Sequence, residues 1–327
     1  MKKIRYGIVG FGNFAERSIL PAVRNSRNSE LVAIQKRSAD QAKSKAAEHG
    51  IPLYFTSVEE MIRSSDIDAV FIASANSQHH SETVIAAEHG KHVLVEKPMS
   101  VTYSEASDMV QACKMSGVKF MVGHMLRFSP LLRRMKEIVD RKTIGEITFA
   151  RADFIYDARN SKRGWLWNKE TAGGGPLYDI GIHCLDSLRY VLDDEVKNVT
   201  AMRRGFDETK VESTSLLSLQ FSKGPLGSVY SSFEAGYRQT YIEFQGTAGS
   251  VSAFNFTPSR THSVIETKIG KDGSIGDVQK EEIDVPDLYE LELSHFSDCI
   301  LHNTEPLITA ESALHNQFVL EQAVRQK

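Results

Sequence analysis

A lysine and an aspartate–histidine pair stand in settings that favour proton exchange with a substrate. Lys97 follows a β-branched apolar run at residues 92–96 and precedes Pro98, which fixes the backbone after it. Asp179 and His183 lie four residues apart in the segment GGGPLYDIGIHCLD, so a helical turn puts both on one face. Histidine titrates near neutral pH, an ammonium stabilises a developing alkoxide, and a carboxylate orients substrate or imidazole. Taken alone, Lys97 is as consistent with a surface lysine as with a catalytic one. The segment with Asp179 and His183 is what favours a catalytic role.

The segment GFGNFA at residues 10–15 has the spacing G-x-G-x-x-G/A of a dinucleotide-binding loop. Gly10 permits the tight turn, Gly12 lets the backbone approach a pyrophosphate, and Ala15 keeps the following helix close to the strand. The free N–H groups at the start of that helix face the anion. A plain tight turn is the alternative, but the strand–loop–helix setting favours a nucleotide. The loop residues expected to bind it are Gly10, Gly12, Asn13, Phe14 and Ala15.

The end of the second expected strand selects the form of the nucleotide. Residues 34–38 read IQKRS, with no carboxylate to bind an adenosine 2′-hydroxyl. A 2′-phosphate carries about 1.5 to 2 negative charges at neutral pH, which Lys36 and Arg37 can neutralise and hydrogen-bond. A solvated basic turn is the alternative. The turn therefore favours NADP, with NAD as the second choice.

The first third of the chain alternates short apolar runs with alanine- and charge-rich stretches of helical spacing. Strands are expected at residues 6–10, 31–35, 69–73, 92–96 and 119–123, and helices at 39–49 and 81–89. Continuous apolar strands separated by helices predict a parallel sheet that is covered on both faces, with ligands beyond the carboxyl ends of the strands. Lys97 then points into the crevice where a nicotinamide lies.

After about residue 125 the pattern changes to period-two alternation, which predicts a mostly antiparallel sheet with a few helices. Strands are expected at 145–156, 214–221, 226–233 and 240–245, and helices at 183–192, 287–302 and 311–325. The 327 residues suit two cores, so we expect a dinucleotide-binding domain at 1–125 and a substrate-binding domain at 126–327. The fold class is α/β, with a doubly wound Rossmann sheet followed by an α+β domain.

Composition excludes several classes of partner. The 39 Lys and Arg residues against 42 Asp and Glu leave a charge of −3, which offers no general attraction for nucleic acid or an anionic membrane. No apolar run approaches 18 residues, so no membrane span is expected. Three scattered cysteines, without CxxC spacing, predict neither disulfides nor a structural metal. We expect a cytoplasmic protein.

The ordered motifs GFGNFA, EKP and GGGPLYDIGIH resemble those of the Gfo/Idh/MocA family, named after glucose-fructose oxidoreductase and inositol dehydrogenase, along essentially the whole chain. The resemblance implies a Rossmann domain followed by a domain with a large open sheet, which usually forms the interface of a dimer or tetramer. It implies oxidation or reduction of a carbinol carbon in a sugar, cyclitol or related polyol with a nicotinamide cofactor.

The same resemblance implies roles for particular residues. Lys97 matches the lysine of the EKP motif, and Asp179 and His183 match an Asp-x-x-x-His pair; these three form the catalytic set. Ala75, Asn76, His79, Glu96 and Lys97 are expected along the cofactor. Ser74-Ala75 stands where the family usually has threonine-proline, a departure from its pattern. Arg127 matches an arginine that often lies near the substrate.

Other choices stay open. Trp165 and Trp167 could wall a substrate pocket or pack in a core. The residues do not decide whether Lys97 or His183 moves the proton, or whether a sugar dehydrogenase or a reductase of keto sugars or dicarbonyls is present. A non-catalytic dinucleotide sensor on the same fold is the competing class, against which the complete catalytic set argues. No third ligand accompanies Asp179 and His183, so no metal is expected.

Overall fold

The computed structural model describes residues 2–161, 163–205 and 211–325. Contacts divide the chain into two compact units. The first comprises Met1–Met125 and Tyr289–Gln317, and the second Leu126–Leu288 and Phe318–Lys327. By these contacts, Tyr289–Gln317 groups with the N-terminal residues; the apolar spacing of a helix does not say which sheet it covers.

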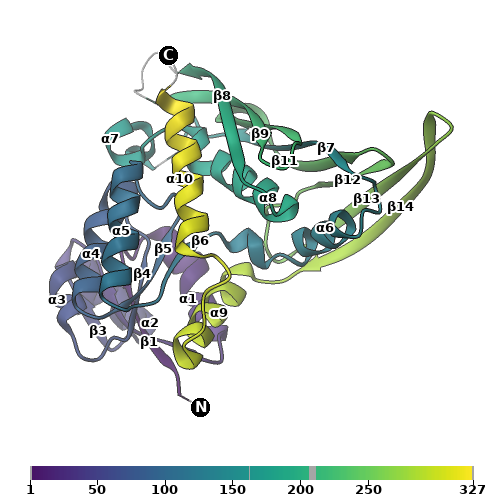
Figure 1. The fold of residues 1–327 in the computed structure, drawn as a ribbon. Helices are drawn as coiled ribbons and strands as arrows, with labels where there is room; N and C mark the ends of the chain where they lie inside the picture. Colours follow the sequence, from purple (N-terminus) through teal and green to yellow (C-terminus); the bar gives the residue numbers. More distant parts are fainter. Residues whose placement is uncertain (1, 162, 206–210, 326–327) are drawn as a thin grey trace. The chain divides into compact units, whose positions relative to one another are not determined.

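The first unit contains a six-stranded, wholly parallel sheet in the order β3-β2-β1-β4-β5-β6 (Figure 1). The order reverses at β1 and β4, and in such sheets this reversal is where a nucleotide binds. Its strands are β1 (Ile4–Val9), β2 (Ser29–Gln35), β3 (Leu53–Phe55), β4 (Ala69–Ile72), β5 (His92–Glu96) and β6 (Phe120–Gly123). The Rossmann architecture expected from the apolar runs is therefore confirmed.

Helices connect these strands, and local sequence signals begin several of them. Ser38 caps α2 by accepting from the Gln41 amide, and Thr102 and Glu105 form a reciprocal capping box at the start of α5. The helices of this unit are α1 (Leu20–Asn25), α2 (Ala39–His49), α3 (Val58–Arg63), α4 (His79–Glu88) and α5 (Tyr103–Met115), with α9 (Leu288–His302) and the start of α10 (Ala310–Arg325).

The late segment of the chain is bonded into the first unit by buried polar groups. The Tyr6 hydroxyl on β1 and the Ser297 hydroxyl on α9 lie 2.8 Å apart. The Asn28 amide donates to the Ser294 carbonyl at 2.9 Å and to Asp298 at 2.7 Å. Buried polar groups of this kind require partners, so α9 is part of the core that β1 and β2 need.

The second unit contains an eight-stranded sheet in the order β14-β13-β12-β11-β7-β10-β9-β8. The pair β7–β10 is parallel and the others are antiparallel. Its strands are β7 (Ile147–Asp157), β8 (Val196–Gly205), β9 (Glu212–Phe221), β10 (Leu226–Ser232), β11 (Glu234–Gly246), β12 (Gly249–Phe254), β13 (Thr261–Lys271) and β14 (Ser274–Val285). The mostly antiparallel sheet expected from period-two alternation is confirmed.

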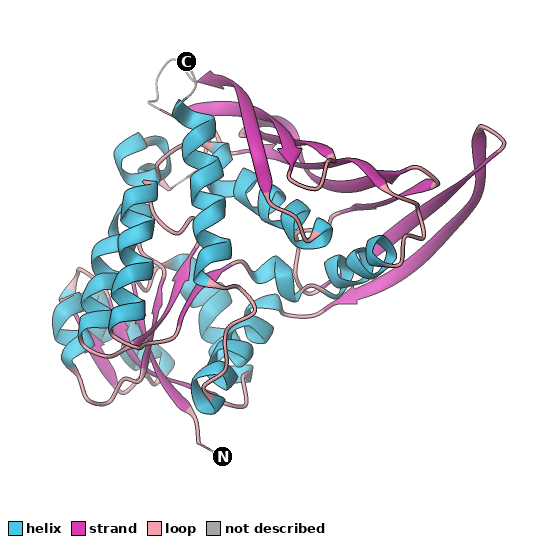
Figure 2. Cartoon of the chain, in the orientation of Figure 1, coloured by secondary structure: helices cyan, strands magenta, loops and turns pink. Residues whose placement is uncertain are grey.

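Helices α6 (Pro130–Asp140) and α8 (Ile182–Leu192) pack on one face of this sheet, and α7 (Lys169–Ala172) lies in the connection before α8 (Figure 2). Side chains alternate accordingly along β7, where Ala150, Ala152 and Phe154 are buried on the helix-covered face. The long hairpin β13–β14 was not expected, because β14 is almost entirely exposed and has no apolar alternation.

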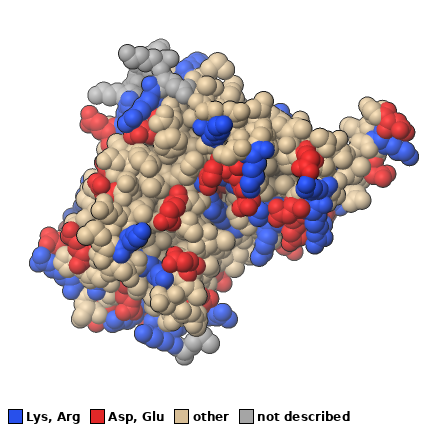
Figure 3. Space-filling model, viewed as in Figure 1, with Lys and Arg blue, Asp and Glu red and all other residues tan. Residues whose placement is uncertain are grey.

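The visible face carries charged side chains of both signs. Basic and acidic side chains are interspersed on the face drawn in Figure 3, without a broad area of one sign. None of the helices in the described part of the chain is both long enough and apolar enough to cross a membrane.

Candidate active site

The glycine loop after β1 is shaped as a dinucleotide-binding loop requires. Gly10 has φ of +73°, and a Cβ there would lie 2.8 Å from the backbone of Ser74, which follows β4. A Cβ on Gly12 would meet no atom nearer than the Gly10 oxygen at 3.8 Å. The fold itself therefore requires glycine at position 10, whereas glycine at position 12 leaves the exposed side of the loop open to a ligand.

The residues after Gly12 differ in exposure. Asn13 and Phe14 are exposed, and the Phe14 ring packs edge-on against Tyr289 with 5.5 Å between ring centroids. Ala15 is buried and begins the π-helical turn Ala15–Ile19, a rare geometry that is frequent at functional sites. The loop thus exposes the Asn13 and Phe14 side chains, while the buried Ala15 keeps the helical turn close to the strand.

The end of β2 carries the two expected cations and one residue that sequence reasoning did not single out. The Gln35 side chain accepts from the Gly10 amide at 3.1 Å and donates to the Thr56 carbonyl at 2.9 Å. The Lys36 ammonium donates to the Phe11 carbonyl at 2.7 Å, and burial lowers its pKa. Arg37 is exposed. Gln35 therefore holds the glycine loop through hydrogen bonds. It places a neutral amide, and not a carboxylate, at the end of β2.

The loop after β4 is held by a buried histidine. His79 is fully buried, with Nδ1 at 2.9 Å from the Pro98 carbonyl and Nε2 at 3.3 Å from the Ser74 carbonyl. Burial lowers the pKa of His79 to about 4, so the ring is neutral and has one N–H, which suits the shorter contact. His79 joins the loop after β4 to the loop that carries Lys97. Its neighbours Ala75 and Asn76 lie in the same loop, with Asn76 buried.

Glu82 on α4 is a buried acid beneath this loop that the sequence did not reveal. Its carboxyl accepts from the Ser74 hydroxyl at 2.5 Å. Burial raises the pKa of Glu82 to about 7, although the Ser74 hydrogen bond opposes the shift. The folded protein thus keeps this carboxyl protonated over a pH range in which the unfolded chain ionises it.

Replacing Glu82 by glutamine is expected to stabilise the protein at alkaline pH. With a folded pKa near 7 and an unfolded value of 4.5, the favourable protonation of Glu82 is complete below pH 4.5 and is lost as pH rises to 7. The neutral amide avoids this loss, so its advantage in unfolding free energy should grow by about 2.5 kcal/mol between pH 5 and pH 8. Urea unfolding of both proteins at the two pH values measures it. The exposed Glu88→Gln on the same helix is the control, and a Glu82→Gln effect that is independent of pH would contradict the assignment.

Lys97 lies directly beyond the carboxyl end of β5. It is partly exposed, and its peptide bond to Pro98 is cis. The buried Glu96 accepts from the Lys97 backbone N–H at 3.2 Å through Oε2, which fixes the backbone that carries the lysine. Glu292 on α9 is fully buried, and burial together with the nearby Glu96 charge raises its pKa well above the usual range. Glu292 is therefore a neutral acid near Glu96.

One group with metal-ligand spacing occurs within the described ranges, formed by Glu16, Glu48 and His49. The Lys45 ammonium bonds the same Glu16 oxygen at 2.7 Å that His49 Nε2 approaches at 2.9 Å. The Lys45 ammonium already neutralises the glutamate, so this arrangement is an ion-pair cluster between Glu16 in the π-helical turn and the end of α2.

The segment with Asp179 and His183 folds as a π-helical turn, Leu177–Gly181, that continues directly into α8. A Cβ on Gly175 would lie 1.9 Å from the Glu212 carbonyl on β9, so glycine lets the turn approach the sheet. The Leu177 amide donates to the Glu212 carboxyl at 3.2 Å. Asp179 is buried, with 8% of its surface exposed, and His183 is partly exposed.

Two residues that sequence reasoning did not name surround Asp179. Arg163 donates to both carboxylate oxygens, with Nη1–Oδ1 at 3.3 Å and Nη2–Oδ2 at 2.9 Å. The Tyr156 hydroxyl donates to Oδ2 at 3.2 Å and accepts from Arg163 Nη2 at 2.7 Å. The His183 ring lies 6.3 Å from the Phe154 ring on β7. Period-two alternation places Tyr156 on the Phe154 face and could have identified it, whereas Arg163 lies in a loop without periodicity.

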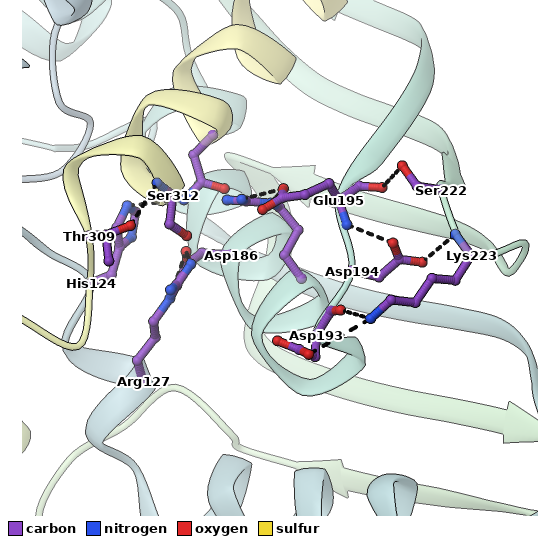
Figure 4. Close-up of polar contacts among 12 residues, drawn as sticks. His124, Arg127, Asp186, Asp193, Asp194, Glu195, Ser222, Lys223, Thr309 and Ser312 are labelled. Carbon is purple, nitrogen blue, oxygen red and sulfur yellow. Dashed lines mark hydrogen bonds and ion pairs between the residues drawn. The ribbon is translucent and has the colours of Figure 1, made fainter.

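Arg127 is bound to Asp186 on α8, as Figure 4 shows. Its Nε lies 3.0 Å and 3.1 Å from the two carboxylate oxygens, and Nη2 lies 2.6 Å from Oδ1. Both side chains are buried. Asp186 raises the pKa of the Arg127 guanidinium despite its burial. This bidentate pair fixes the helix that carries His183.

Where α8 ends, polar groups tie the chain to the loop before β10 (Figure 4). The Asp194 carboxylate accepts from the amides of Glu195 and Lys223, each at 2.8 Å.

The two tryptophans that could wall a substrate pocket, Trp165 and Trp167, are partly exposed. The Trp167 ring packs edge-on against the Phe233 ring, with 5.6 Å between ring centroids.

The parallel sheet with its glycine loop defines a dinucleotide-binding protein, and the lysine and histidine side chains are typical of enzymes that exchange protons with an alcohol or carbonyl. Residues 4–124 match the oxidoreductase family with an NAD-binding Rossmann fold, and residues 132–252 match the GFO/IDH/MocA C-terminal domain. The chain belongs to the Gfo/Idh/MocA family of oxidoreductases.

Characterised relatives align over nearly the whole chain. A 1,5-anhydro-D-fructose reductase of Ensifer adhaerens is 29% identical over 95% of this chain and 92% of its own length. A D-xylose 1-dehydrogenase (NADP(+)) of Haloferax volcanii is 28% identical over 94% and 93%. The crystal structure of aldose-aldose oxidoreductase from Caulobacter crescentus with glycerol is 27% identical, with a TM-score of 0.89 over 99% of this chain and 97% of that one. The chain is thus an oxidoreductase of this family.

Proposed function

We propose that this protein is an NADP-preferring oxidoreductase that interconverts a carbinol and a carbonyl carbon of a sugar, cyclitol or related polyol. The observation that carries the proposal is Lys97 beyond β5 in a family member that also retains Asp179 and His183. The names of the relatives support it, because they act on an anhydroketose, on xylose and on aldoses.

The residues present fit a dinucleotide. The outward side of Gly12 is open, and Gly10 turns the loop toward the carboxyl edge of the sheet. Gly10, Gly12, Asn13, Phe14 and Ala15 would hold the pyrophosphate, Lys36 and Arg37 the adenosine phosphate, and Ala75, Asn76, His79, Glu96 and Lys97 would line or support the nicotinamide half. When bound, the cofactor supplies or accepts the hydride.

The roles proposed for the protein side chains concern proton exchange with the substrate. Lys97 would donate a hydrogen bond to a substrate oxygen and stabilise negative charge there, and His183 would act as a hydrogen-bond partner and as an acid or base for a substrate hydroxyl. Asp179 orients the substrate. Either Lys97 or His183 exchanges the hydroxyl proton. Arg127, through Asp186, fixes the helix that carries His183, and Trp165 and Trp167 contribute apolar surface for a sugar ring.

Turnover assays test this function directly. The purified protein is incubated with NADP⁺ and aldoses, inositols or glycerol-type alcohols, and with NADPH and keto sugars or dicarbonyls, while the absorbance of reduced nicotinamide is followed. Oxidation of a sugar or polyol, or reduction of its carbonyl form, is the expected result. Cofactor binding without turnover in either direction would contradict the proposal and favour a ligand sensor.

Removing both cations after β2 is expected to abolish the preference for NADP. The Lys36 ammonium has three N–H donors and gives one to Phe11, which leaves donors for a 2′-phosphate. Lys36→Ala with Arg37→Ala should raise the Kd for NADPH about 100-fold, since each charge-assisted bond contributes roughly 1.5 kcal/mol. The Kd for NADH should change by less than about threefold, measured by nicotinamide fluorescence. The exposed Lys43→Ala on α2 is the control. An equal loss for both cofactors would show that the cations do not select NADP.

We also propose self-association through the open face of the eight-stranded sheet, as a dimer or tetramer. A row of mostly apolar side chains crosses the face opposite α8, and Met202 and Phe254 within it are 67% and 58% exposed. The register aligns Met202, Leu216, Tyr230, Asp153, Tyr241 and Phe254. Exposed apolar rows of this kind usually mark interfaces. Light scattering that gives the mass of a single chain would contradict this.

A cytoplasmic location is proposed on the chemistry of the cysteines. Cys113, Cys184 and Cys299 are buried thiols, as suits a reducing compartment. Recovery of the native protein in the soluble cytosolic fraction of its source cells tests this location, and recovery outside the cytosol would contradict it.

A further inference from the structure

Arg163 shares the carboxylate of Asp179 with Tyr156, and the three side chains come from separate elements. Tyr156 is on β7, Asp179 is in the π-helical turn before α8, and Arg163 directly precedes the turn Gly164–Trp167. Both guanidinium Nη atoms donate to the carboxylate, while the Tyr156 hydroxyl receives one N–H from Arg163 and gives its own to Asp179. Such a fork-to-carboxylate pair defines an orientation as well as a charge balance.

Because the Asp179 carboxylate is buried, the Arg163 guanidinium stabilises its ionised form. The Asp179 side chain is 9% exposed, so an ionised carboxylate there needs a cation or several donors. The Arg163 side chain is 43% exposed, and its five N–H groups exceed the three that these contacts use. Arg163 can therefore hold Asp179 and still reach a ligand on its exposed side.

Among the described residues, other titratable groups also lie near Asp179. Glu212 on β9 binds the Leu177 amide of the same turn and is acidic. Tyr156 stays a neutral hydroxyl, because burial and the Asp179 charge raise its pKa. His183 follows Asp179 by one helical turn and packs beside Phe154. Asp179 in return outweighs the effect of burial and raises the pKa of Arg163.

We propose that Arg163 is a positioning residue for Asp179, which keeps the carboxylate ionised and aimed, and that it also helps to select substrates with two adjacent oxygens. An ionised Asp179 accepts a hydrogen bond from a substrate hydroxyl, and Arg163, which can only donate, binds the oxygen on the neighbouring carbon. A vicinal diol or an α-hydroxy carbonyl provides this pair of oxygens. The inference rests on the proposed function for its substrate, but the charge state of Asp179 is independent of turnover.

Arg163→Met removes the cation and retains an apolar stem, and Arg163→Lys restores a single charge. With the best substrate of the turnover panel, Arg163→Met should lower kcat about 10-fold and move the acid limb of the kcat–pH profile upward by at least one pH unit. Arg163→Lys should return the limb toward its original position. The Kd for NADPH should stay within about twofold in both variants, because neither alters the glycine loop. In Arg163→Met, a substrate that lacks the adjacent oxygen should lose less in kcat/KM than a vicinal diol, because only the diol also loses the direct contact with Arg163.

Arg159→Met is the matched control, since Arg159 lies in the same loop and pairs with Asp157 in the same bidentate manner at the surface. It should leave kcat, KM and the acid limb unchanged. Equal effects of Arg159→Met and Arg163→Met would overturn the proposal, as would an unshifted acid limb in Arg163→Met.

A titration without substrate separates failure of this inference from failure of the proposed function. The side-chain carboxyl carbons of aspartate are labelled with ¹³C and followed by NMR, and Asp179→Asn assigns the Asp179 signal. The midpoint for Asp179 should lie at higher pH in Arg163→Met than in the parent, even if no substrate is turned over. Equal midpoints would overturn the positioning role. Near-ultraviolet circular dichroism of each variant confirms that the fold is retained.

Discussion

Replacing Lys97 by methionine is expected to lower kcat about 1,000-fold while the protein still binds NADPH. The variant retains the apolar stem but loses the ammonium that donates to the substrate oxygen, and such a group contributes about 3 to 4 kcal/mol to the transition state. The Glu96–Lys97 backbone contact and the Pro98–His79 contact do not involve the ammonium, so the loop should stay in place. Steady-state kinetics and nicotinamide fluorescence measure the two effects.

The control for this variant is Lys114→Met, which removes an exposed lysine at the end of α5. It should leave kcat within about twofold. Near-normal turnover of Lys97→Met with cofactor bound would rule out a catalytic role for Lys97. Comparison of Lys97→Met with His183→Asn shows which residue transfers the proton. The variant that lacks the proton-exchanging group should lose one limb of the kcat–pH profile. The other variant should lower kcat without moving that limb.

Replacing Asp186 by asparagine is expected to destabilise the second unit by about 3 to 5 kcal/mol. The substitution leaves the Arg127 guanidinium buried without its counter-charge, which costs more than the loss of a surface pair. The helix α8 should then fray first around His183, so activity should fall at temperatures below the unfolding transition. Urea unfolding monitored by circular dichroism measures the change in free energy.

Two comparisons separate charge burial from simple loss of contact. Arg127→Met combined with Asp186→Leu removes both charges and should recover more than half of the lost stability, since apolar groups of similar size often replace buried ion pairs. Arg134→Met breaks a half-exposed pair with Glu281 and should cost less than about 1 kcal/mol. If Asp186→Asn were as mild as Arg134→Met, the buried pair would not be a major source of stability.

Much of the fold follows from local patterns in the sequence. The runs that form β1 and β5 are apolar over their whole length because the sheet is covered on both faces, and the alternation in β7 reflects one covered face. The glycine loop was recognisable because its spacing has a mechanism. Strand β14 lacked such a signal, since its exposed residues need no apolar period.

The candidate site was less accessible to sequence reasoning, because its supporting contacts come from loops that have no periodic pattern. Glu82 sits among apolar helix residues, and its partner Ser74 belongs to a loop eight residues earlier. Arg163 reaches Asp179 from an irregular loop. Lys97, Asp179 and His183 were identifiable from their positions after a strand and on a helical turn, and their catalytic roles stay predictions that the variants above address.

The hydrogen bonds of α9 to β1 and β2 have a consequence for folding of the chain during translation. The Tyr6 hydroxyl and the Asn28 amide meet their partners Ser297, Ser294 and Asp298 only when almost the whole polypeptide has been made. An emerging chain therefore carries an incomplete nucleotide-binding half while every strand of the second unit is synthesised. Folding of that half is completed after translation, and a fragment that ends at residue 125 would expose to solvent the surface that α9 normally seals.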